Sequence, residues 1–236
     1  MISPQTVLVT GANRGIGLEI TQQMLRKGHR VFATCREPDA AIELKNMRHS
    51  FGRNMEIFSL DVDNPRDRRS LYLYLKKLHI GLDLLVNNAG ASVWDSLSDL
   101  SPDVILDLVR TNAVSPLLLS RDLVPFLERS ENPRIIMMSS RLGSMEMSRE
   151  VSRNSYAYAM SKAGLNMGTV QLAGNLREKS IAVIAQSPGW VRTDMGGADA
   201  PLSVSEAVRS MLKAFAGYRI KDTGSFFSEI GEPLPW

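Results

Sequence analysis

The sequence predicts an α/β fold in which helices cover both faces of a doubly wound parallel sheet, and three observations support this prediction. Short apolar runs rich in β-branched residues recur along the chain. Helical patterns of about ten to twenty residues separate them, the length that a crossover between parallel strands requires. No linker or internal repeat interrupts the 236 residues, so we expect a single domain. About seven strands are expected, at residues 6–10, 30–34, 55–60, 82–86, 134–138, 181–186 and 224–228.

The composition excludes several functional classes. Hydrophobic residues make up 44% of the chain and charged residues 22%, which suits a globular protein with a large core. The formal net charge of +3 does not indicate a nucleic-acid surface but suits an anionic ligand. Cys35 is the single cysteine, so no intramolecular disulfide can form. Because no apolar run has membrane-spanning length and no signal peptide is evident, we expect a cytoplasmic protein without nucleic-acid or membrane partners.

The first expected strand, 6–10, leads into the glycine-rich segment TGANRGIG at 10–17. Gly11, Gly15 and Gly17 would permit a tight turn, close approach of the backbone to a pyrophosphate, and close packing of the helix that follows. The N-terminus of that helix offers unpaired N–H groups to the anion. The segment therefore predicts a dinucleotide site, with a purely structural glycine turn as the alternative.

The end of the second expected strand, 30–34, indicates which dinucleotide binds. An acidic residue there would bind the ribose 2′-OH, whereas a basic residue would neutralise a 2′-phosphate. Arg36 follows the strand, and Arg14 in the glycine turn is expected to approach the same phosphate. Glu37 complicates this reading, because it lies about twenty residues after the glycines, where NAD-binding proteins place an acidic residue. Since Glu37 lies beyond the strand end, we favour NADP(H) over NAD(H), with solvated surface charges as the alternative for either arginine.

A tyrosine followed four positions later by a lysine occurs twice, and positions four apart share a helix face. Tyr72 and Lys76 lie on the flank of an amphipathic helix before the fourth strand, and we interpret them as surface residues. Tyr158 and Lys162 belong to a helix that is apolar nearly all round, which predicts a buried helix. Tyr156 points nearly the opposite way. Lysine side chains are rarely buried, and a role in proton transfer would explain the burial of Lys162.

The predicted chemistry is hydride transfer coupled to proton transfer. A free phenol has a pKa of about 10, and the Lys162 ammonium is expected to lower the pKa of Tyr158. Ser139 or Ser140, at the carboxyl end of the strand 134–138, is expected to hydrogen-bond the substrate oxygen where charge develops. A nicotinamide would supply the hydride, while the protein supplies position and acidity.

Two irregular segments, 141–155 and 194–203, follow expected strands and are predicted to be loops at the carboxyl edge of the sheet, where ligands bind. An apolar set of side chains without a charged clamp is expected to line the crevice, which favours a small hydrophobic aldehyde, ketone or quinone. Packing against the protein itself is the alternative for each of them. These side chains are Trp94, Leu142, Met145, Trp190 and Met195.

Several segments match one family pattern in chain order. They are TGANRGIG at 10–17, LDV at 60–62, NNAG at 87–90, Asn112 within TNAVSP, the serines at 139–140, Tyr158 to Lys162, and PGWVRTDM at 188–195. Together they resemble the short-chain dehydrogenase/reductase family over essentially the whole chain. Within that family, the YAY tyrosine pair and the terminal PLPW are most similar to carbonyl reductases of the sniffer type and to C-factor-like proteins.

The resemblance implies a Rossmann fold, with residues 1–110 mainly binding the dinucleotide and residues 111–236 carrying catalysis and substrate binding. It implies a catalytic tetrad of Asn112, Ser140, Tyr158 and Lys162, in which Asn112 supports a water-mediated proton relay to Lys162. No metal site is implied. The cofactor-binding residues are expected to be Gly11, Asn13, Arg14, Gly15, Ile16, Gly17, Arg36, Asp61, Val62, Asn88, Ala89, Gly90, Tyr158, Lys162, Pro188, Gly189, Val191 and Thr193.

Three of these roles are specific to the resemblance: Asp61 and Val62 flank the adenine, and Thr193 touches the nicotinamide amide. Each has a structural alternative when taken alone. The asparagines could satisfy backbone groups at strand and helix ends, and Asp61 could cap the helix that begins near Pro65.

The function implied is reduction of carbonyl groups by NADPH, with Tyr158 as the proton donor. Two alternatives stay open: a dinucleotide-binding signalling or sensor protein of the C-factor type, and another reaction of the family, such as enoyl reduction or epimerisation. The enzyme is favoured because a sensor needs no proton donor. The long segment between Ser140 and Tyr158 predicts a monomer or homodimer, with the tetramer common in the family as the alternative.

Overall fold

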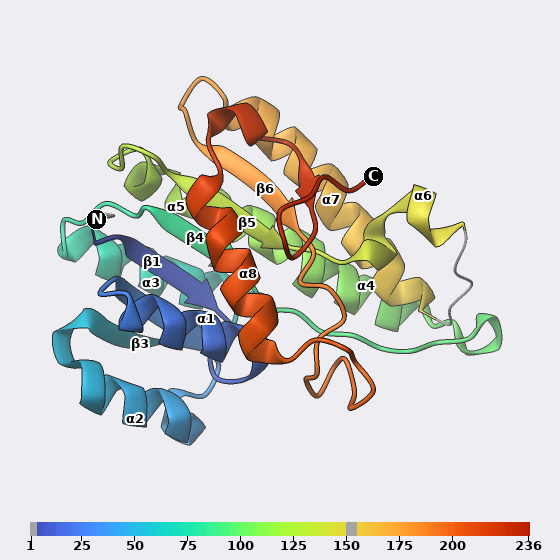
Figure 1. The fold of residues 1–236 in the computed structure, drawn as a ribbon, viewed down its shortest axis with the longest axis horizontal. Helices are drawn as coiled ribbons and strands as arrows, with labels where there is room; N and C mark the ends of the chain where they lie inside the picture. Colours follow the sequence, from blue (N-terminus) through green and yellow to red (C-terminus); the bar gives the residue numbers. More distant parts are fainter. Residues whose placement is uncertain (1–3, 150–154) are drawn as a thin grey trace.

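A computed structural model describes residues 4–149 and 155–236 of the chain. Its centre is a parallel sheet with the strand order β3-β2-β1-β4-β5-β6-β7, which confirms the predicted seven-stranded, doubly wound architecture (Figure 1). The expected strands differ from the observed ones by only a few residues at their ends. The strands are β1 (Thr6–Thr10), β2 (Arg30–Cys35), β3 (Met55–Ser59), β4 (Leu84–Asn87), β5 (Arg134–Met138), β6 (Ala182–Gln186) and β7 (Phe226–Phe227).

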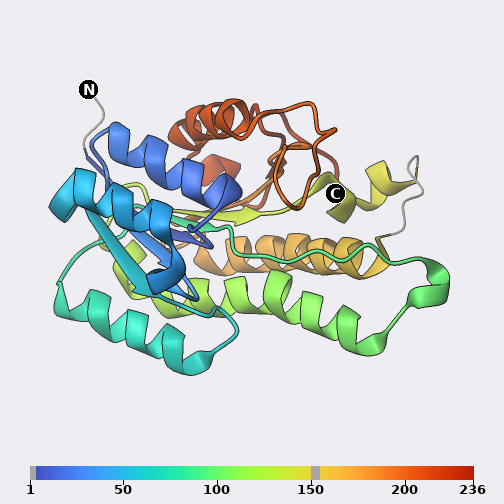
Figure 2. The ribbon, with the colours of Figure 1, turned by 90° about the horizontal axis from the view of Figure 1, so that it is seen from below.

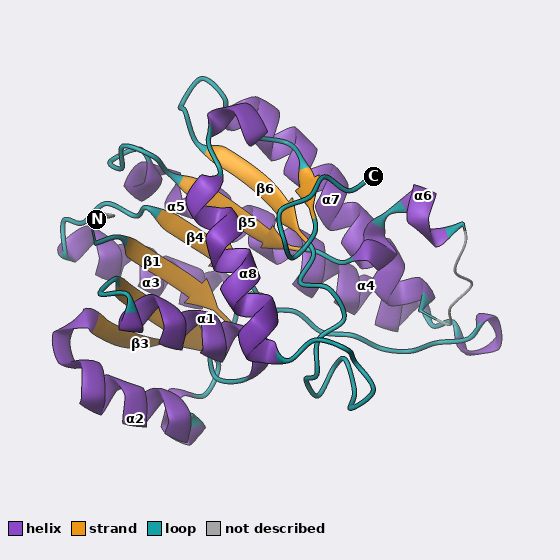
Figure 3. Cartoon of the chain, in the orientation of Figure 1, coloured by secondary structure: helices purple, strands orange, loops and turns teal. Residues whose placement is uncertain are grey.

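Helices cover both faces of the sheet, as Figure 2 shows from the side. The helices α1, α2 and α8 pack on one face, and α3, α5 and α7 pack on the other. In the described ranges the helices are α1 (Gly15–Arg26), α2 (Ile42–Phe51), α3 (Pro65–Lys77), α4 (Pro102–Val109), α5 (Ser115–Leu127), α6 (Met145–Ser148), α7 (Tyr156–Leu176) and α8 (Val204–Gly217). Figure 3 separates these elements from the connecting loops by colour.

The strands supply both hydrophobic cores because successive side chains point to opposite faces of a sheet. In β1, Val7 and Val9 belong to the cluster under α1 and α8, whereas Leu8 belongs to the cluster under α3 and α7. The central strands β5 and β6 are buried throughout, as expected for parallel strands covered on both faces. The carboxyl ends of the strands point toward the side of the molecule where α6 lies (Figure 1).

A π-helical turn, η4 (Arg110–Val114), joins α4 to α5 and carries Asn112. Asp63, after β3, accepts hydrogen bonds from the hydroxyls of Thr111 and Ser115, each at 2.6 Å. These two bonds lie on either side of Asn112 in the chain. They hold the wide turn in place, and such turns are frequent at functional sites.

Two expectations about burial are wrong. The helix α7 is not buried all round, because Met160, Met167 and Val170 are exposed. The reason is its position: α7 packs against β6, α4, α5 and the turns η4 (Arg110–Val114) and η5 (Arg141–Gly143), and these three side chains lie outside those contacts, in solvent. Tyr72 is not simply a surface residue, because its ring packs edge-on against Phe126 with centroids 5.3 Å apart.

The segment 194–203 contains no helix or named strand, as expected of a loop. The segment 141–155 was expected to be a loop throughout, and this is wrong for part of it. It contains a 3-10 turn, η5 (Arg141–Gly143), and the short helix α6. Residues 150–154 of that prediction lie outside the described residues.

Candidate active site

The turn between β1 and α1 has the backbone that a dinucleotide site requires. Gly11 and Gly15 have φ angles of +63° and +54°, which other residues rarely adopt. A Cβ atom at Gly17 would lie 2.3 Å from the Gly11 carbonyl oxygen, so only glycine fits there. In the described chain no side chain caps the start of α1, which leaves its first N–H groups available to a phosphate. The turn therefore fits the pyrophosphate of a dinucleotide.

Asn88 and Thr10 tie this turn to the end of β4. The Asn88 side-chain amide donates to the carbonyl oxygens of Thr10 and Gly11, at 2.9 and 3.1 Å. The Thr10 hydroxyl accepts from the backbone N–H groups of Asn88 and Ala89. The alternative considered for Asn88, satisfaction of backbone groups, thus describes its side chain. Sequence reasoning missed Thr10, although a hydroxyl at a strand end directly before a glycine turn was a visible signal.

The segment 188–196 lies against the glycine turn. A Cβ atom at Gly15 would be 3.5 Å from the Thr193 methyl carbon, so Thr193 lies beside the glycine turn. Gly189 has a φ of +77°, which lets the chain turn after β6. Of the other expected cofactor residues, the exposed ones are Asn13 and Gly90, the half-buried ones are Ile16, Ala89 and Pro188, and the buried ones are Val62 and Val191.

The two arginines expected at a 2′-phosphate differ in their partners. Arg14 Nη1 forms an ion pair with Asp194 Oδ2 at 2.9 Å, and both side chains are largely exposed. Arg36 is also exposed, and among the residues described here it has no ion-pair partner. Arg36 is therefore free to meet an anion, whereas Arg14 would have to share its charge with Asp194. Sequence reasoning did not detect this acidic partner.

Asp61 lies at the end of β3 but does not cap α3. Its Oδ1 accepts from the backbone N–H of Asp63 at 3.0 Å, while Asn64 supplies the cap by accepting from Arg66 N–H at 2.9 Å. The structural alternative considered for Asp61 is therefore wrong. Its half-buried carboxylate stays at the carboxyl edge of the sheet, on the same edge as the glycine turn.

Lys162 is buried at the carboxyl end of β5, with only 6% of its surface exposed. Its Nζ donates to the Met138 carbonyl oxygen at 2.8 Å and lies 5.6 Å from the centre of the Tyr158 ring. Burial lowers the pKa of Lys162 to about 8, because desolvation disfavours the ammonium form. The group is thus still mostly protonated at neutral pH and loses its proton in mild alkali.

The pKa of Tyr158 departs from the expectation. Burial is the larger cause and raises the pKa of the phenol, while a hydrogen bond with the Ser140 side chain lowers it. Lys162 was expected to lower the pKa of Tyr158 below its ordinary value. This prediction is wrong, because the pKa of Tyr158 is raised. The physical reason is that desolvation of the phenolate outweighs the favourable contacts.

The two serines after β5 have different surroundings. Ser140 is half-buried, contacts Tyr158, and accepts from the Leu142 backbone N–H at 3.2 Å. Ser139 is 3% exposed and donates its hydroxyl to Asn166 Oδ1 at 2.5 Å. Only Ser140 is thus oriented toward the phenol.

Asn112 is 1% exposed and uses its whole side chain to join other segments. Its Oδ1 accepts from the Ala91 N–H at 2.8 Å, and its Nδ2 donates to the Ala91 carbonyl at 2.8 Å and to Ser161 Oγ at 2.9 Å. A Cβ atom at Gly90 would lie 3.0 Å from Asn112 Oδ1 and 3.7 Å from Lys162 Nζ. The structure thus brings Asn112 Oδ1 and Lys162 Nζ close to the same face of Gly90, and no hydrogen bond joins these two side chains.

Most of the side chains expected to line the crevice are exposed. The exposed fractions are 60% for Trp94, 70% for Met145, 52% for Trp190 and 41% for Met195. Leu142 is half-buried. A large part of each of these four side chains therefore lies in solvent. Trp190 is oriented by its indole N–H, which donates to the Gly196 carbonyl at 2.7 Å.

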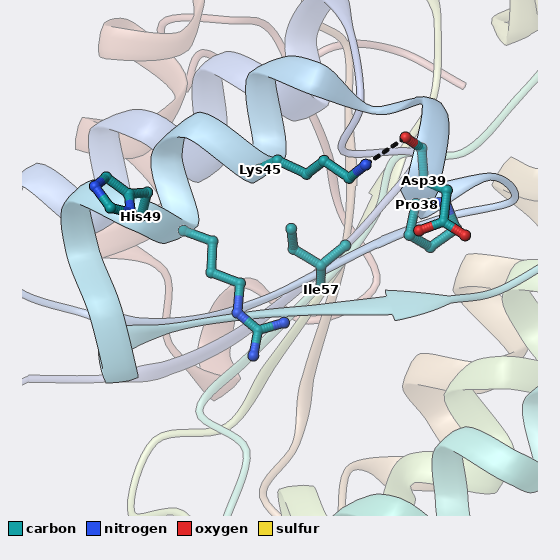
Figure 4. Close-up of a pocket in the computed structure, with 6 residues that line it drawn as sticks. Pro38, Asp39, Lys45, His49 and Ile57 are labelled. Carbon is teal, nitrogen blue, oxygen red and sulfur yellow. Dashed lines mark hydrogen bonds between the residues drawn. The ribbon is translucent and has the colours of Figure 1, made fainter.

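A cavity of about 520 Å³ lies between α2 and β3 (Figure 4). It adjoins the turn that follows Arg36, and Lys45 Nζ closes one end by donating to the Asp39 carbonyl at 2.6 Å. None of the four expected tetrad residues belongs to its walls, so the cavity is not the reaction site. The residues that line it are Pro38, Asp39, Lys45, Arg48, His49 and Ile57.

Within residues 4–149 and 155–236, no group of three or more His, Cys, Asp or Glu side chains is arranged to hold a metal ion. Over the same ranges, every helix is too short or too polar to cross a lipid bilayer.

Comparison with known proteins places these features in a family. The family model described as short chain dehydrogenase matches residues 5–201. A curated relative, C-signal from Myxococcus xanthus, is 37% identical over 159 residues, which is 66% of this chain and 93% of that protein.

Solved structures agree over the full length. The chain is similar to the NADPH-bound carbonyl reductase from chicken fatty liver, with a TM-score of 0.94, 34% identity and coverage of 100% of both chains. It is also similar to the carbonyl reductase Sniffer of D. melanogaster, with a TM-score of 0.93, 31% identity, and coverage of 99% of this chain and 100% of that chain.

Proposed function

Because the chain belongs to the short-chain dehydrogenase family, a family of oxidoreductases, we propose that it reduces small hydrophobic carbonyl compounds with NADPH. The observation that carries the proposal is the meeting of Tyr158, Ser140 and Lys162 at the carboxyl end of β5. A phenol, a hydroxyl and an ammonium in this arrangement suit the transfer of a proton to a carbonyl oxygen. The likeness to carbonyl reductases supports the same reaction.

The glycine turn and the start of α1 would hold the pyrophosphate of the dinucleotide, and Asp61 with Val62 would flank the adenine. When bound, the nicotinamide supplies the hydride. Arg36 would bind the 2′-phosphate of NADPH because its guanidinium is exposed and unpaired among the described residues. The NADPH bound to the chicken carbonyl reductase supports this choice of cofactor over NADH.

Tyr158 donates its phenolic proton to the carbonyl oxygen of the substrate. Ser140 hydrogen-bonds the same oxygen as negative charge develops on it. Lys162, mostly protonated at neutral pH because its pKa is about 8, stabilises the phenolate that remains on Tyr158. Asn112 holds the Ala91 segment against α7, and a water near its backbone would return the proton through Lys162.

The substrate is a small aldehyde, ketone or quinone with an apolar body. The support is the exposed apolar surface of Trp94, Met145, Trp190 and Met195, with Leu142 beside Ser140. Apolar side chains at the rim of a ligand site would contact the apolar body of such a substrate.

We also propose how the chain is divided between its two roles, where it acts and how it assembles. Residues 1–110 mainly bind the dinucleotide, and residues 111–236 carry catalysis and substrate binding. The protein acts in the cytoplasm as a monomer or homodimer, with a tetramer as the alternative assembly, and its partner in the reaction is the small carbonyl compound.

Titration with NADPH and with NADH, followed by nucleotide fluorescence, tests the cofactor. A panel of aldehydes, ketones and quinones then tests the reaction by NADPH oxidation. The Tyr158→Phe variant should still bind NADPH, because the glycine turn and Arg36 are intact, but lose at least about 100-fold in kcat, because the proton donor is gone. Failure of the wild-type protein to oxidise NADPH with any member of the panel would count against carbonyl reduction.

The likeness to C-signal favours a second candidate, a dinucleotide-binding protein that acts in signalling. The same variant separates the candidates, because a sensor needs the glycine turn but not the Tyr158 hydroxyl. Retention of cellular function by Tyr158→Phe would support the sensor, and its loss together with turnover would support the enzyme. Product analysis would reveal a different family reaction, such as enoyl reduction or epimerisation.

A further inference from the structure

One side chain of α7 hydrogen-bonds to both ends of the turn that carries Ser140. Asn166 lies one helical turn after Lys162 and is 4% exposed. Its Oδ1 accepts from the Ser139 hydroxyl at 2.5 Å, and its Nδ2 donates to the Gly143 carbonyl at 3.0 Å. These two bonds, called the Asn166 bracket below, hold both ends of the segment 139–143 on the helix that also bears Tyr158.

The orientation of this amide follows from its partners. The carbonyl of Gly143 can only accept, so the amide nitrogen of Asn166 must face it. The amide oxygen then faces Ser139, whose hydroxyl can donate. Because these groups are buried, loss of either bond would leave a polar group without a partner or force the turn to move.

Close packing supports the same contact. A Cβ atom at Gly143 would lie 2.8 Å from the carbonyl carbon of Lys162 and 2.9 Å from its carbonyl oxygen. The absence of a side chain at Gly143 therefore lets the turn lie directly on the backbone of α7. The contact with Lys162 and the bracket by Asn166 fix the turn on two successive turns of the helix.

Ser140 lies inside this bracket. Its Oγ accepts from the Leu142 N–H at 3.2 Å, and the Ser140 side chain is near enough to the Tyr158 phenol to lower its pKa. We infer that Asn166 and Ser139 are positioning residues, which hold the 139–143 turn on α7 so that the Ser140 hydroxyl meets the Tyr158 phenol. The inference rests on the proposed function, in which Ser140 and Tyr158 act on one oxygen.

The first test measures the titration of the Tyr158 phenol and needs no substrate. Tyrosinate absorbance is followed against pH for each variant and compared with the same variant carrying Tyr158→Phe, which isolates one tyrosine. Asn166→Leu should raise the pKa of Tyr158 as Ser140→Ala does, because both remove the hydrogen bond that lowers it. Asn175→Leu is the matched control, since Asn175 lies on the same helix, is exposed and bonds only within it, to the Gln171 carbonyl.

Kinetics supply the second test. Asn166→Leu should lower kcat by about 10–100-fold with NADPH affinity unchanged, because misplacement of a catalytic group has effects of that size. Ser139→Ala removes one of the two bonds and should cause a smaller loss of about 3–10-fold. The double variant Asn166→Leu with Ser140→Ala should be no slower than Ser140→Ala alone, since both changes act on one hydroxyl.

A folded Asn166→Leu protein with an unshifted Tyr158 titration would overturn the inference, as would additive losses in the double variant. If Asn166→Leu fails to fold, Ser139→Ala carries the same two tests, and an unshifted titration in that variant overturns the inference. If the wild-type protein reduces no carbonyl compound, the proposed function alone fails, because the titration still reports the positioning of Ser140.

Discussion

Lys162 shows how a single buried residue sets the conditions under which the site works. Desolvation lowers its pKa from the ordinary value of 10.5 to about 8, whereas the pKa of Tyr158 is raised. The lysine therefore loses its proton before the tyrosine does as pH rises. The alkaline limit of the proposed reaction then belongs to Lys162, not to the proton donor.

We expect carbonyl reduction to slow as pH rises through about 8, the pKa of Lys162. Neutral Lys162 no longer stabilises the phenolate, although Tyr158 keeps its proton. The kcat of Lys162→Arg, measured from neutral to alkaline pH, should be lower but without this limb, because a guanidinium stays charged. Persistence of the limb in the variant would assign it to another group.

Arg36 should decide the choice between NADPH and NADH. Arg36→Ala should lower kcat/KM for NADPH by about 10–100-fold and leave the value for NADH nearly unchanged, since hydrogen bonds to charged groups contribute roughly 1.5–3 kcal/mol. Arg53→Ala is the control, because Arg53 is another exposed arginine, on the turn after α2. An equal loss of kcat/KM with both cofactors would show that Arg36 does not bind the 2′-phosphate.

At the scale of elements, substitution by alanine is expected to have opposite effects on stability at two glycines that lie inside helices. Gly17 lies in the first turn of α1, where a Cβ atom would be 2.3 Å from the Gly11 carbonyl and 2.5 Å from Asn88 Nδ2. Gly174 lies in α7, where a Cβ atom would meet nothing within 4 Å. A Gly→Ala substitution therefore tests steric crowding at Gly17 and helix propensity at Gly174.

Gly17→Ala should destabilise the protein by about 1–3 kcal/mol and weaken NADPH binding at least tenfold, because overpacking displaces the turn and Asn88. Gly174→Ala should stabilise it by about 0.5–1 kcal/mol and leave binding unchanged. Chemical denaturation and nucleotide titration measure both effects. A stable Gly17→Ala protein with normal affinity would contradict the account of the glycine turn.

The helix α7 illustrates why the pairing of residues along a helix was easier to predict than the burial of its faces. The pairing of Tyr158 with Lys162 follows from helical period alone. Its apolar composition suggested burial on every side, yet Met160 and Met167 are exposed. Burial depends on which other elements pack against a helix, and local sequence does not contain that information.

For the whole molecule, burial of Lys162 has a cost in stability. Its pKa is lower in the folded chain than in the unfolded chain, so between about 8 and 10.5 the unfolded chain binds more protons. The stability of the protein should therefore rise with pH through that window, as far as this group contributes. Below about pH 8 the cost of the buried ammonium is fully present.

Lys162→Met should accordingly stabilise the protein near neutral pH by about 1–3 kcal/mol, reduced by loss of the bond to the Met138 carbonyl. The gain should shrink as pH rises from about 8 to 10.5, and well above 10.5 wild-type Lys162 is neutral in both states. Urea unfolding at a series of pH values measures the difference. A variant that is less stable at every pH would show that the lysine contributes to stability instead of reducing it.

The sequence by itself determined the parallel fold, the approximate positions of its seven strands and the glycine turn, because hydrophobic period and glycine conformation are local properties. It also predicted that Lys162 is buried and that Lys76 is exposed. Only the tertiary structure decided which groups surround each site residue. The raised pKa of Tyr158, the commitment of Asn112 to Ala91, and the bracket formed by Asn166 all depend on segments far apart in the chain, which packing brings together.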